Sequence, residues 1–288
     1  MKPRLRVAAK ESSILKKFVG LFKSISTALK RVLLSVALAI CIVACNTGMR
    51  EMDKPDCSKM VYIPNPFNCE TNQNFARCSQ LQGDYKMALF AFRQCLSHCD
   101  TDFNILNNIG DCLFKLDSTE EAIPYFNLAL KLNQENPTTN YNLAVAYWEK
   151  EDYAAAKSYI EDALKYSKEE DNECYSLYGE ILFQLHEFEE AEKMMRKAIE
   201  LNDSNLFYKR RLGAILGSRG KYKEALEITN DVLKNEKLDT IDLVNFLDLK
   251  SLLLVELGDS ANACETVQKI YNLKSDFQLT GDFRFCDD

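Results

Sequence analysis

The chain has 288 residues, enough for one large domain or two ordinary ones, and its charge is divided unevenly. Residues 1–44 carry nine Lys or Arg and one acid, a net charge of +8, so residues 45–288 carry −15 against −7 for the whole chain. Phosphate repels such an acidic body, which argues against nucleic-acid binding. Few glycines and prolines favour helices over strands, and only two histidines limit chemistry that depends on imidazole.

An uncharged run from Val32 to Ala44 follows the basic head. As a helix this run would cover about 20 Å, whereas a bilayer core needs about 30 Å. It has instead the length of the apolar part of a secretory signal peptide. Its end, Ile42-Val43-Ala44-Cys45, resembles the lipobox of bacterial lipoproteins, in which the cysteine is acylated and becomes the mature N-terminus. The resemblance implies that residues 1–44 are a lipoprotein signal peptide and that Cys45 is the lipidation site.

Residues 46–68 have no helical period and contain three prolines, so we interpret residues 45–68 as a lipid-anchored flexible tether that reaches on the order of 25 Å. The lipoprotein resemblance implies a place in the bacterial cell envelope. Asn46 favours the outer membrane, because some lipoproteins kept at the inner membrane carry Asp directly after the lipidated cysteine. The alternative is an intracellular adaptor that retains the apolar run as an anchor.

From residue 69 onward the chain repeats itself. Alanines recur at intervals of 34, 34, 35, 34 and 38 residues, at Ala88, Ala122, Ala156, Ala191, Ala225 and Ala263. The segments around them include GDYKMALFAF, EDYAAAKSYI and GKYKEALEIT, and a small residue recurs upstream, as in LNNIGDCLF and YSLYGEILF. This pattern resembles the tetratricopeptide repeat (TPR). The resemblance implies an all-α fold, a right-handed superhelical α-solenoid of about six helix-turn-helix units.

The resemblance covers residues 69–277 and leaves residues 278–288 as a C-terminal tail, too short for a further long helix. The units are predicted near residues 69–102, 103–136, 137–170, 172–205, 206–239 and 244–277. The repeated alanines are expected where the second helix of a unit crosses the first closely, and Gly110 and Gly213 at close contacts of a first helix. Ser118 and Glu121 have the spacing of a capping box.

The chain contains eleven cysteines. We interpret five of them, at helical positions that face a neighbour, as small apolar packing residues: Cys78, Cys95, Cys112, Cys174 and Cys264. Cys69 opens the first helix of the first unit and Cys99 closes the second. Antiparallel helices bring those two ends together, so a Cys69–Cys99 disulfide is predicted if the chain is exported to an oxidising compartment. Cys57–Cys69 and Cys264–Cys286 are the alternatives.

Cys95, His98 and Cys99 also suggest a redox or metal-binding protein. A structural zinc site needs four ligands, however, and no second ligand pair follows at a standard spacing. The sequence also contains no glycine-rich phosphate loop and no convergent acid–base pair. We therefore predict no enzyme, with no catalytic residue, cofactor, metal or small-molecule substrate, and keep the redox or metal-binding protein as the alternative.

In TPR proteins the first helices line a concave groove that holds a peptide or helix of another protein. By resemblance, the groove positions are 2, 5, 9, 12 and 13 of each unit. The predicted partner-binding residues are Arg77, Asn104, Asn107, Asp111, Phe114, Lys115, Tyr141, Trp148, Phe183, Phe207 and Arg210, with Glu149 and Glu180 at equivalent positions. Trp148, the single tryptophan, is the strongest candidate for a contact residue. We predict a membrane-anchored scaffold or assembly factor that binds another protein.

Overall fold

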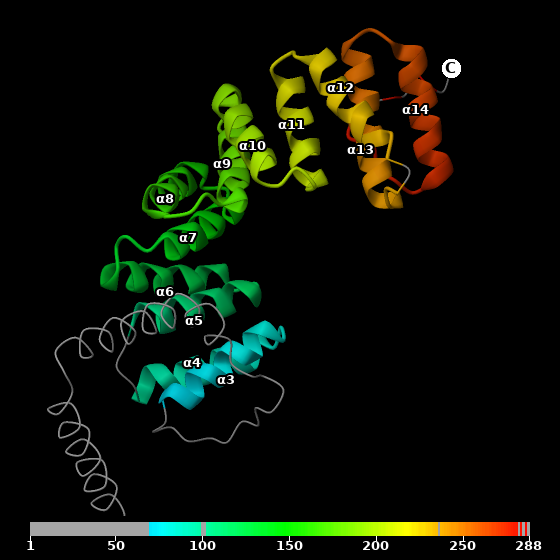
Figure 1. Ribbon diagram of the computed structural model, residues 1–288. Coiled ribbons are helices and arrows are strands. Elements are labelled where there is room, and N and C mark those ends of the chain that lie inside the picture. Colours follow the sequence, from blue (N-terminus) through cyan, green and yellow to red (C-terminus); the bar gives the residue numbers. More distant parts are fainter. Residues whose placement is uncertain (1–68, 99–101, 236, 282, 284–285, 287–288) are drawn as a thin grey trace, which may run out of the picture. The chain divides into compact units, whose positions relative to one another are not determined.

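The computed structural model describes residues 69–98, 102–235, 237–281, 283 and 286. These residues form twelve α-helices and no strand (Figure 1), which confirms the predicted all-α repeat fold. The helices are α3 (Cys69–Leu81), α4 (Tyr85–His98), α5 (Phe103–Lys115), α6 (Thr119–Leu132), α7 (Pro137–Glu149), α8 (Tyr153–Tyr166), α9 (Asn172–Gln184), α10 (Phe188–Leu201), α11 (Leu206–Ser218), α12 (Tyr222–Leu233), α13 (Thr240–Glu256) and α14 (Ser260–Leu273). All of them belong to the second of two compact units of the chain, residues 62–288.

The predicted signal peptide and the lipidation site Cys45 lie outside the described residues. The same holds for the predicted tether and for Cys57 and Cys99. None of the described helices combines the length and the apolar composition that crossing a bilayer requires.

The helices pack in consecutive pairs, α3 with α4 through α13 with α14. The second helix of each pair also contacts the first helix of the next pair. In addition, the first helices from α5 onward contact one another in order: α5 with α7, α7 with α9, α9 with α11, and α11 with α13. We call the side of the molecule formed by this row the first-helix face.

Small residues allow the helices to approach one another closely. The six repeated alanines on the second helices are all fully buried. On α5, a Cβ at Gly110 would lie 2.6 Å from Cε1 of Phe126 on α6, a ring that is itself buried. On α11, a Cβ at Gly213 would lie 2.7 Å from Cδ2 of Leu249 on α13. Glycine at these two positions therefore makes room for a large side chain of a neighbouring helix.

The turn within each pair contains one residue with positive φ. These residues are Gly83, Asp117, Glu151, His186, Gly220 and Gly258. Several helices begin after an Asp or Asn cap, as where the Asp102 carboxylate accepts a hydrogen bond from the Ile105 N–H. Ser118 makes no such cap, because its hydroxyl donates to the carbonyl oxygen of Leu116 in the preceding turn. The predicted capping box at Ser118 is therefore wrong.

A charged cluster on Glu192 joins α10 to the turn between α11 and α12. Glu192 is only 7% exposed, and its carboxylate accepts hydrogen bonds from Arg196, Arg219 and Lys221. Arg196 also pairs with Glu224 on α12. Burial alone would raise the pKa of Glu192, but the hydrogen bonds from Lys221, Arg196 and Arg219 outweigh burial and lower this pKa to about 2.

The C-terminal tail folds back onto the last helix pair. We call its described residues, 277–281, 283 and 286, the C-terminal latch. Phe283 is buried against Leu254 of α13 and Val267 of α14. Thr280 donates hydrogen bonds from its backbone N–H and its hydroxyl to the buried carboxylate of Asp248 on α13. The latch therefore covers apolar surface that another helix would cover in a longer array.

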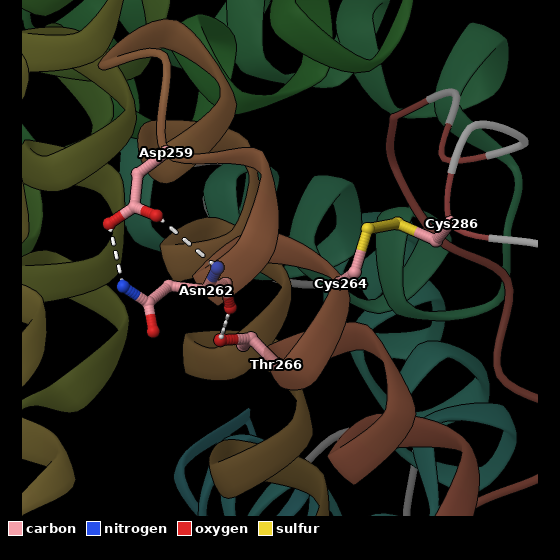
Figure 2. The surroundings of a disulfide bond; sticks show 5 residues. All are labelled: Asp259, Asn262, Cys264, Thr266 and Cys286. Atoms are coloured by element: carbon pink, nitrogen blue, oxygen red, sulfur yellow. Dashed lines mark hydrogen bonds between the residues drawn. A yellow bond between two sulfur atoms is a disulfide. The ribbon is translucent and has the colours of Figure 1, made fainter. Parts of the chain in front are cut away.

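A disulfide between Cys264 of α14 and Cys286 fastens the C-terminal latch. Figure 2 shows this bond near the start of α14, whose N-cap Asp259 accepts hydrogen bonds from Asn262 through its carboxylate. The predicted alternative Cys264–Cys286 is thus present, and the bond closes a stretch with a sequence separation of 22 residues.

Two of the five cysteines that we interpreted as packing residues are instead disulfide-bonded. Cys264 bonds Cys286, and Cys78, buried on α3, is disulfide-bonded as well. For Cys264 that interpretation was wrong because the C-terminal tail, and not another repeat, packs against α14. The other three are free and buried, as predicted: Cys95, Cys112 and Cys174.

Cys69 is disulfide-bonded as well. Its Sγ lies 4.0 Å from the carbonyl oxygen of His98 at the end of α4, which places the start of α3 beside the end of α4. The predicted partner Cys99 directly follows His98 but lies outside the described residues, so the Cys69–Cys99 pairing stays a prediction.

Candidate partner-binding groove

A hollow of about 420 Å³ opens on the first-helix face between α7, α9 and α11. Its lining residues are Tyr141, Trp148, Glu173, Ser176, Leu177, Glu180, Phe207, Tyr208 and Arg211. We call it the aromatic hollow, after the rings that α7 and α11 contribute. Four of the nine lining residues are aromatic and four are polar or charged. A concave surface that combines aromatic rings with polar groups is typical of sites that bind a ligand or a peptide side chain.

Trp148 contributes an unpaired hydrogen-bond donor to the wall of the aromatic hollow. Its Nε1 is buried and has no hydrogen-bond partner among the residues that the structure describes. An indole N–H can only donate, and a buried donor left without an acceptor costs about 1–3 kcal/mol. The neighbouring Tyr147 stacks on Tyr159, with ring centroids 5.4 Å apart. Trp148 therefore combines a place in the wall of the hollow with an unsatisfied donor.

Arg211 and Glu180 form the most buried charged pair in this wall. Arg211 of α11 donates from Nε and Nη2 to the two carboxylate oxygens of Glu180 on α9, which is 6% exposed. The guanidinium also lies over two aromatic rings, with its Cζ 5.5 Å from the centroid of Phe183 and 5.9 Å from that of Phe207. The two charges of the pair therefore cancel, and the rings of Phe183 and Phe207 hold the guanidinium in place.

Among the three charged residues that line the aromatic hollow, Glu173 is the one that no other lining residue neutralises. Its side chain is exposed, and no Lys or Arg of the described residues forms an ion pair with it. Burial and then the charge of Glu173 raise the pKa of the Tyr141 hydroxyl, which lines the same hollow. Glu173 and Tyr141 therefore lie close enough to interact electrostatically.

A second hollow, also of about 420 Å³, follows on the same face between α9, α11 and α13. Its lining residues are Phe183, Ala214, Gly217, Ser218, Tyr222, Leu249, Leu252, Leu253 and Glu256. We call it the aliphatic hollow. Arg211, stacked on Phe183, lies between the two hollows. Leu252 joins the aliphatic hollow to the C-terminal latch, because it also packs into the cluster around Phe283.

The structure brings three of the predicted groove residues together in the aromatic hollow: Tyr141, Trp148 and Phe207. Glu180 lines it as well, and Phe183 lines the aliphatic hollow. Arg77 and Asn104 lie apart from them, in a polar hollow of about 380 Å³ that α3 and α5 line.

Other predicted residues join neighbouring first helices. Asn107 Oδ1 accepts hydrogen bonds from the Thr139 hydroxyl at 3.0 Å and from the Asn142 amide at 3.1 Å, both on α7. Asp111 accepts from the Gln80 amide of α3 at 2.9 Å, and burial raises the pKa of Asp111. These side chains already have partners within the solenoid, so they hold the repeats in register.

Phe114, Lys115 and Arg210 lie on first helices outside both hollows. Phe114 packs partly buried against the N-terminal core, with Lys115 Nζ 5.8 Å from its ring centroid. Arg210 lies over the exposed ring of Phe207, with Cζ 5.8 Å from the centroid. Glu149, at the end of α7, accepts a hydrogen bond from the Thr119 hydroxyl.

Sequence reasoning did not single out five residues of the aromatic hollow: Glu173, Ser176, Leu177, Tyr208 and Arg211. Glu173 and Ser176 occupy positions 2 and 5 of the fourth unit. Both are groove positions, so the repeat register could have predicted these two residues as part of the groove. Arg211 is at position 6 of its unit, outside the groove register. The sequence feature that could best have indicated Arg211 is the acidic Glu180, which occupies a groove position in the preceding unit and needs a basic partner.

The cysteine–histidine alternative gains no support from the geometry. Cys95 is free and fully buried, and burial raises the pKa of its thiol, which disfavours the thiolate that binds metals. Within the described ranges, no three or more His, Cys, Asp or Glu side chains are grouped so that they could hold a metal ion. Cys99 lies outside those ranges.

Stacked helix pairs with a hollowed row of first helices define an α-solenoid repeat protein. Residues 101–169 and 141–205 each match a family model described as tetratricopeptide repeat, so this stretch of the chain carries tetratricopeptide repeats. The TPR repeat-containing protein MJ1428 of Methanocaldococcus jannaschii is 28% identical over 204 residues, 66% of this chain and 35% of that protein. The BBSome complex member BBS4 of Bos taurus is 25% identical over 154 residues, 54% of this chain and 29% of that protein. The chain thus spans about a third of the length of these curated relatives.

Solved structures share the fold. YrrB, described as a TPR protein with an unusual peptide-binding site, has a TM-score of 0.57 at 22% identity over 66% of this chain and 95% of its own. PilF of Pseudomonas aeruginosa has a TM-score of 0.59 at 14% identity over 73% of this chain and 93% of its own. At these identities the likeness concerns the fold alone.

Proposed function

We propose that this chain is a non-enzymatic scaffold or assembly factor that binds another protein on its first-helix face. The observation that carries the proposal is the aromatic hollow, which places Trp148, with its unpaired N–H, among residues of three successive repeats. The peptide-binding site named for the structural neighbour YrrB supports the same use of the fold. An extended peptide or a helix of the partner fits a surface built in this way.

We further propose that the protein is a lipoprotein, acylated at Cys45 and held at the outer membrane of the bacterial envelope. The basic head, the short apolar run and the lipobox-like end at Cys45 support this. The disulfide bonding of Cys69, Cys78, Cys264 and Cys286 adds support, since disulfides persist mainly in oxidising compartments. Several acyl chains anchor a protein stably where a single chain is marginal.

The mass of the N-terminal peptide of protein purified from membranes tests the anchor. We expect a peptide that begins at Cys45 and carries added acyl mass. An intact, unacylated head would contradict the lipoprotein proposal and favour an intracellular adaptor with a retained anchor. Separation of the inner and outer membranes then shows which membrane holds the protein.

Crosslinking in cells tests the binding face. We expect Trp148→Ala to reduce the yield of crosslinked partner while the helical circular dichroism stays unchanged. Tyr271→Ala is the matched control, because Tyr271 is 41% exposed on α14, a second helix. Equal loss of partner in both variants, or loss in neither, would contradict binding at the first-helix face.

A further inference from the structure

We infer that the aromatic hollow is a subsite for one basic side chain, a lysine or arginine of a peptide segment in the partner protein. This inference rests on the proposed function, that the first-helix face binds a protein. It adds the chemical class of the residue that the hollow recognises.

The charges around the hollow select for a cation. Three charged side chains line it, and Arg211 neutralises Glu180 within the wall. Glu173 is the remaining charge, exposed and without an ion-pair partner among the described residues. An acidic side chain entering here would meet the uncompensated carboxylate of Glu173, whereas a lysine or arginine would pair with it.

The rings of the hollow are suited to a cation for a second, independent reason. Arg211 already shows that a guanidinium packs on rings of this face, with its Cζ 5.5 Å from the centroid of Phe183 and 5.9 Å from that of Phe207. Tyr141 and Trp148, on the α7 side, have no such cation over their rings within the described part of the chain. Aromatic faces beside a carboxylate attract lysine and arginine through cation–π and ionic terms together.

The position of Arg210 sets where the basic side chain lies. Arg210 covers the exposed ring of Phe207, so the α11 side of the hollow already has a positive charge. The incoming side chain is therefore expected on the opposite side, between Trp148 of α7 and Glu173 of α9. A backbone carbonyl of the same peptide would accept from Trp148 Nε1 once the indole turns toward it.

The test uses the full chain in detergent and an array of random twelve-residue peptides. Trp148 is the only tryptophan, so its fluorescence reports directly on the hollow when binding peptides are resynthesised without tryptophan. We expect the binding peptides to be enriched in lysine or arginine. We expect Glu173→Gln to weaken their binding about five-fold, and Glu173→Lys to weaken it further. Glu189→Gln, an exposed acid on the second helix α10, is the matched control and should change nothing.

The outcomes separate this inference from the proposed function. Peptides that change Trp148 fluorescence without basic enrichment, or with equal affinity for Glu173→Gln, would overturn the basic subsite and leave the binding face intact. Enrichment in aspartate or glutamate would also overturn it. If no peptide binds and Trp148→Ala retains its partner in cells, both the subsite and the proposed function fail.

Discussion

Arg211 and Glu180 join two successive first helices through a buried ion pair that lies between the aromatic and aliphatic hollows. The Glu180 side chain is 9% exposed and the Arg211 side chain 23%. A charge with so little exposure to water is tolerated only when its partner is present. Removal of either residue would therefore leave the other as an unpaired buried charge. The pair fixes α9 against α11 at the point where a bound peptide would pass from one hollow to the other.

Arg211→Met should destabilise the protein by about 3 kcal/mol, because it leaves the Glu180 carboxylate buried without its cation. Urea unfolding measures this. The double variant Arg211→Met/Glu180→Leu should recover most of the loss, since it removes both charges. Lys193→Met breaks an exposed pair with Glu190 and should cost less than 1 kcal/mol. An equal loss of unfolding free energy in Arg211→Met and Lys193→Met would show that the buried pair stabilises the fold no more than an exposed one.

The Glu192 cluster predicts a loss of stability in acid. The pKa of Glu192 is lowered from 4.5 to about 2 in the folded protein, so its stabilisation is present above the unfolded pKa near 4.5. It is lost as the pH falls from about 4.5 toward 2. The contribution above this window is about 3 kcal/mol. Urea unfolding at pH 7 and pH 3 measures how much the free energy of unfolding falls in acid. This fall should be smaller for Glu192→Gln than for wild type, and Glu189→Gln should behave as wild type.

Gly110→Ala and Gly217→Ala form a matched pair. At Gly110 the new Cβ would lie 2.6 Å from the buried ring of Phe126, so we expect a loss of about 1–3 kcal/mol. At Gly217 the new Cβ would lie 3.4 Å from Leu253, so the better helix propensity of alanine should prevail, with a gain of up to about 1 kcal/mol. Thermal unfolding measures both. A gain at Gly110 would mean that Phe126 moves aside easily.

Cys286→Ser should release the C-terminal latch from α14. Loss of a disulfide over this sequence separation costs about 3 kcal/mol. Hydrogen exchange should rise in α13 and α14 and stay unchanged in α5 to α8, because each helix pair depends mainly on its neighbours. Cys174→Ala, which changes a free buried cysteine, keeps the latch. Unchanged exchange in α13 and α14 would show that Phe283 and Thr280 hold the latch without the bond.

The repeat could be predicted from the sequence because every unit places the same kinds of residue at the same spacing. Ala122, Ala156 and their equivalents must be small wherever two helices cross, so the same residue recurs at each crossing. The groove register likewise placed Tyr141, Trp148 and Phe207 on one face, and these three meet in one hollow. Residues that satisfy the same packing requirement in every unit can be recognised by comparing the units with one another.

Features that occur only once could not be found in that way. Cys264 occupies a helical position like the free cysteines, and only the return of the tail shows that it faces Cys286. Arg211 belongs to the hollow because α11 presents it to Glu180, a contact between units that no single unit encodes. Asn107 was predicted to bind a partner, yet its amide oxygen already accepts two hydrogen bonds from α7. Such assignments depend on how neighbouring repeats meet.

The C-terminal latch also bears on whether copies of this protein can join end to end. A stack of helix pairs presents at its last pair a surface on which the first pair of another copy could stack. Here Phe283 and its neighbours occupy part of that surface, and Cys264–Cys286 keeps them there. We therefore expect the oxidised protein to resist head-to-tail polymerisation.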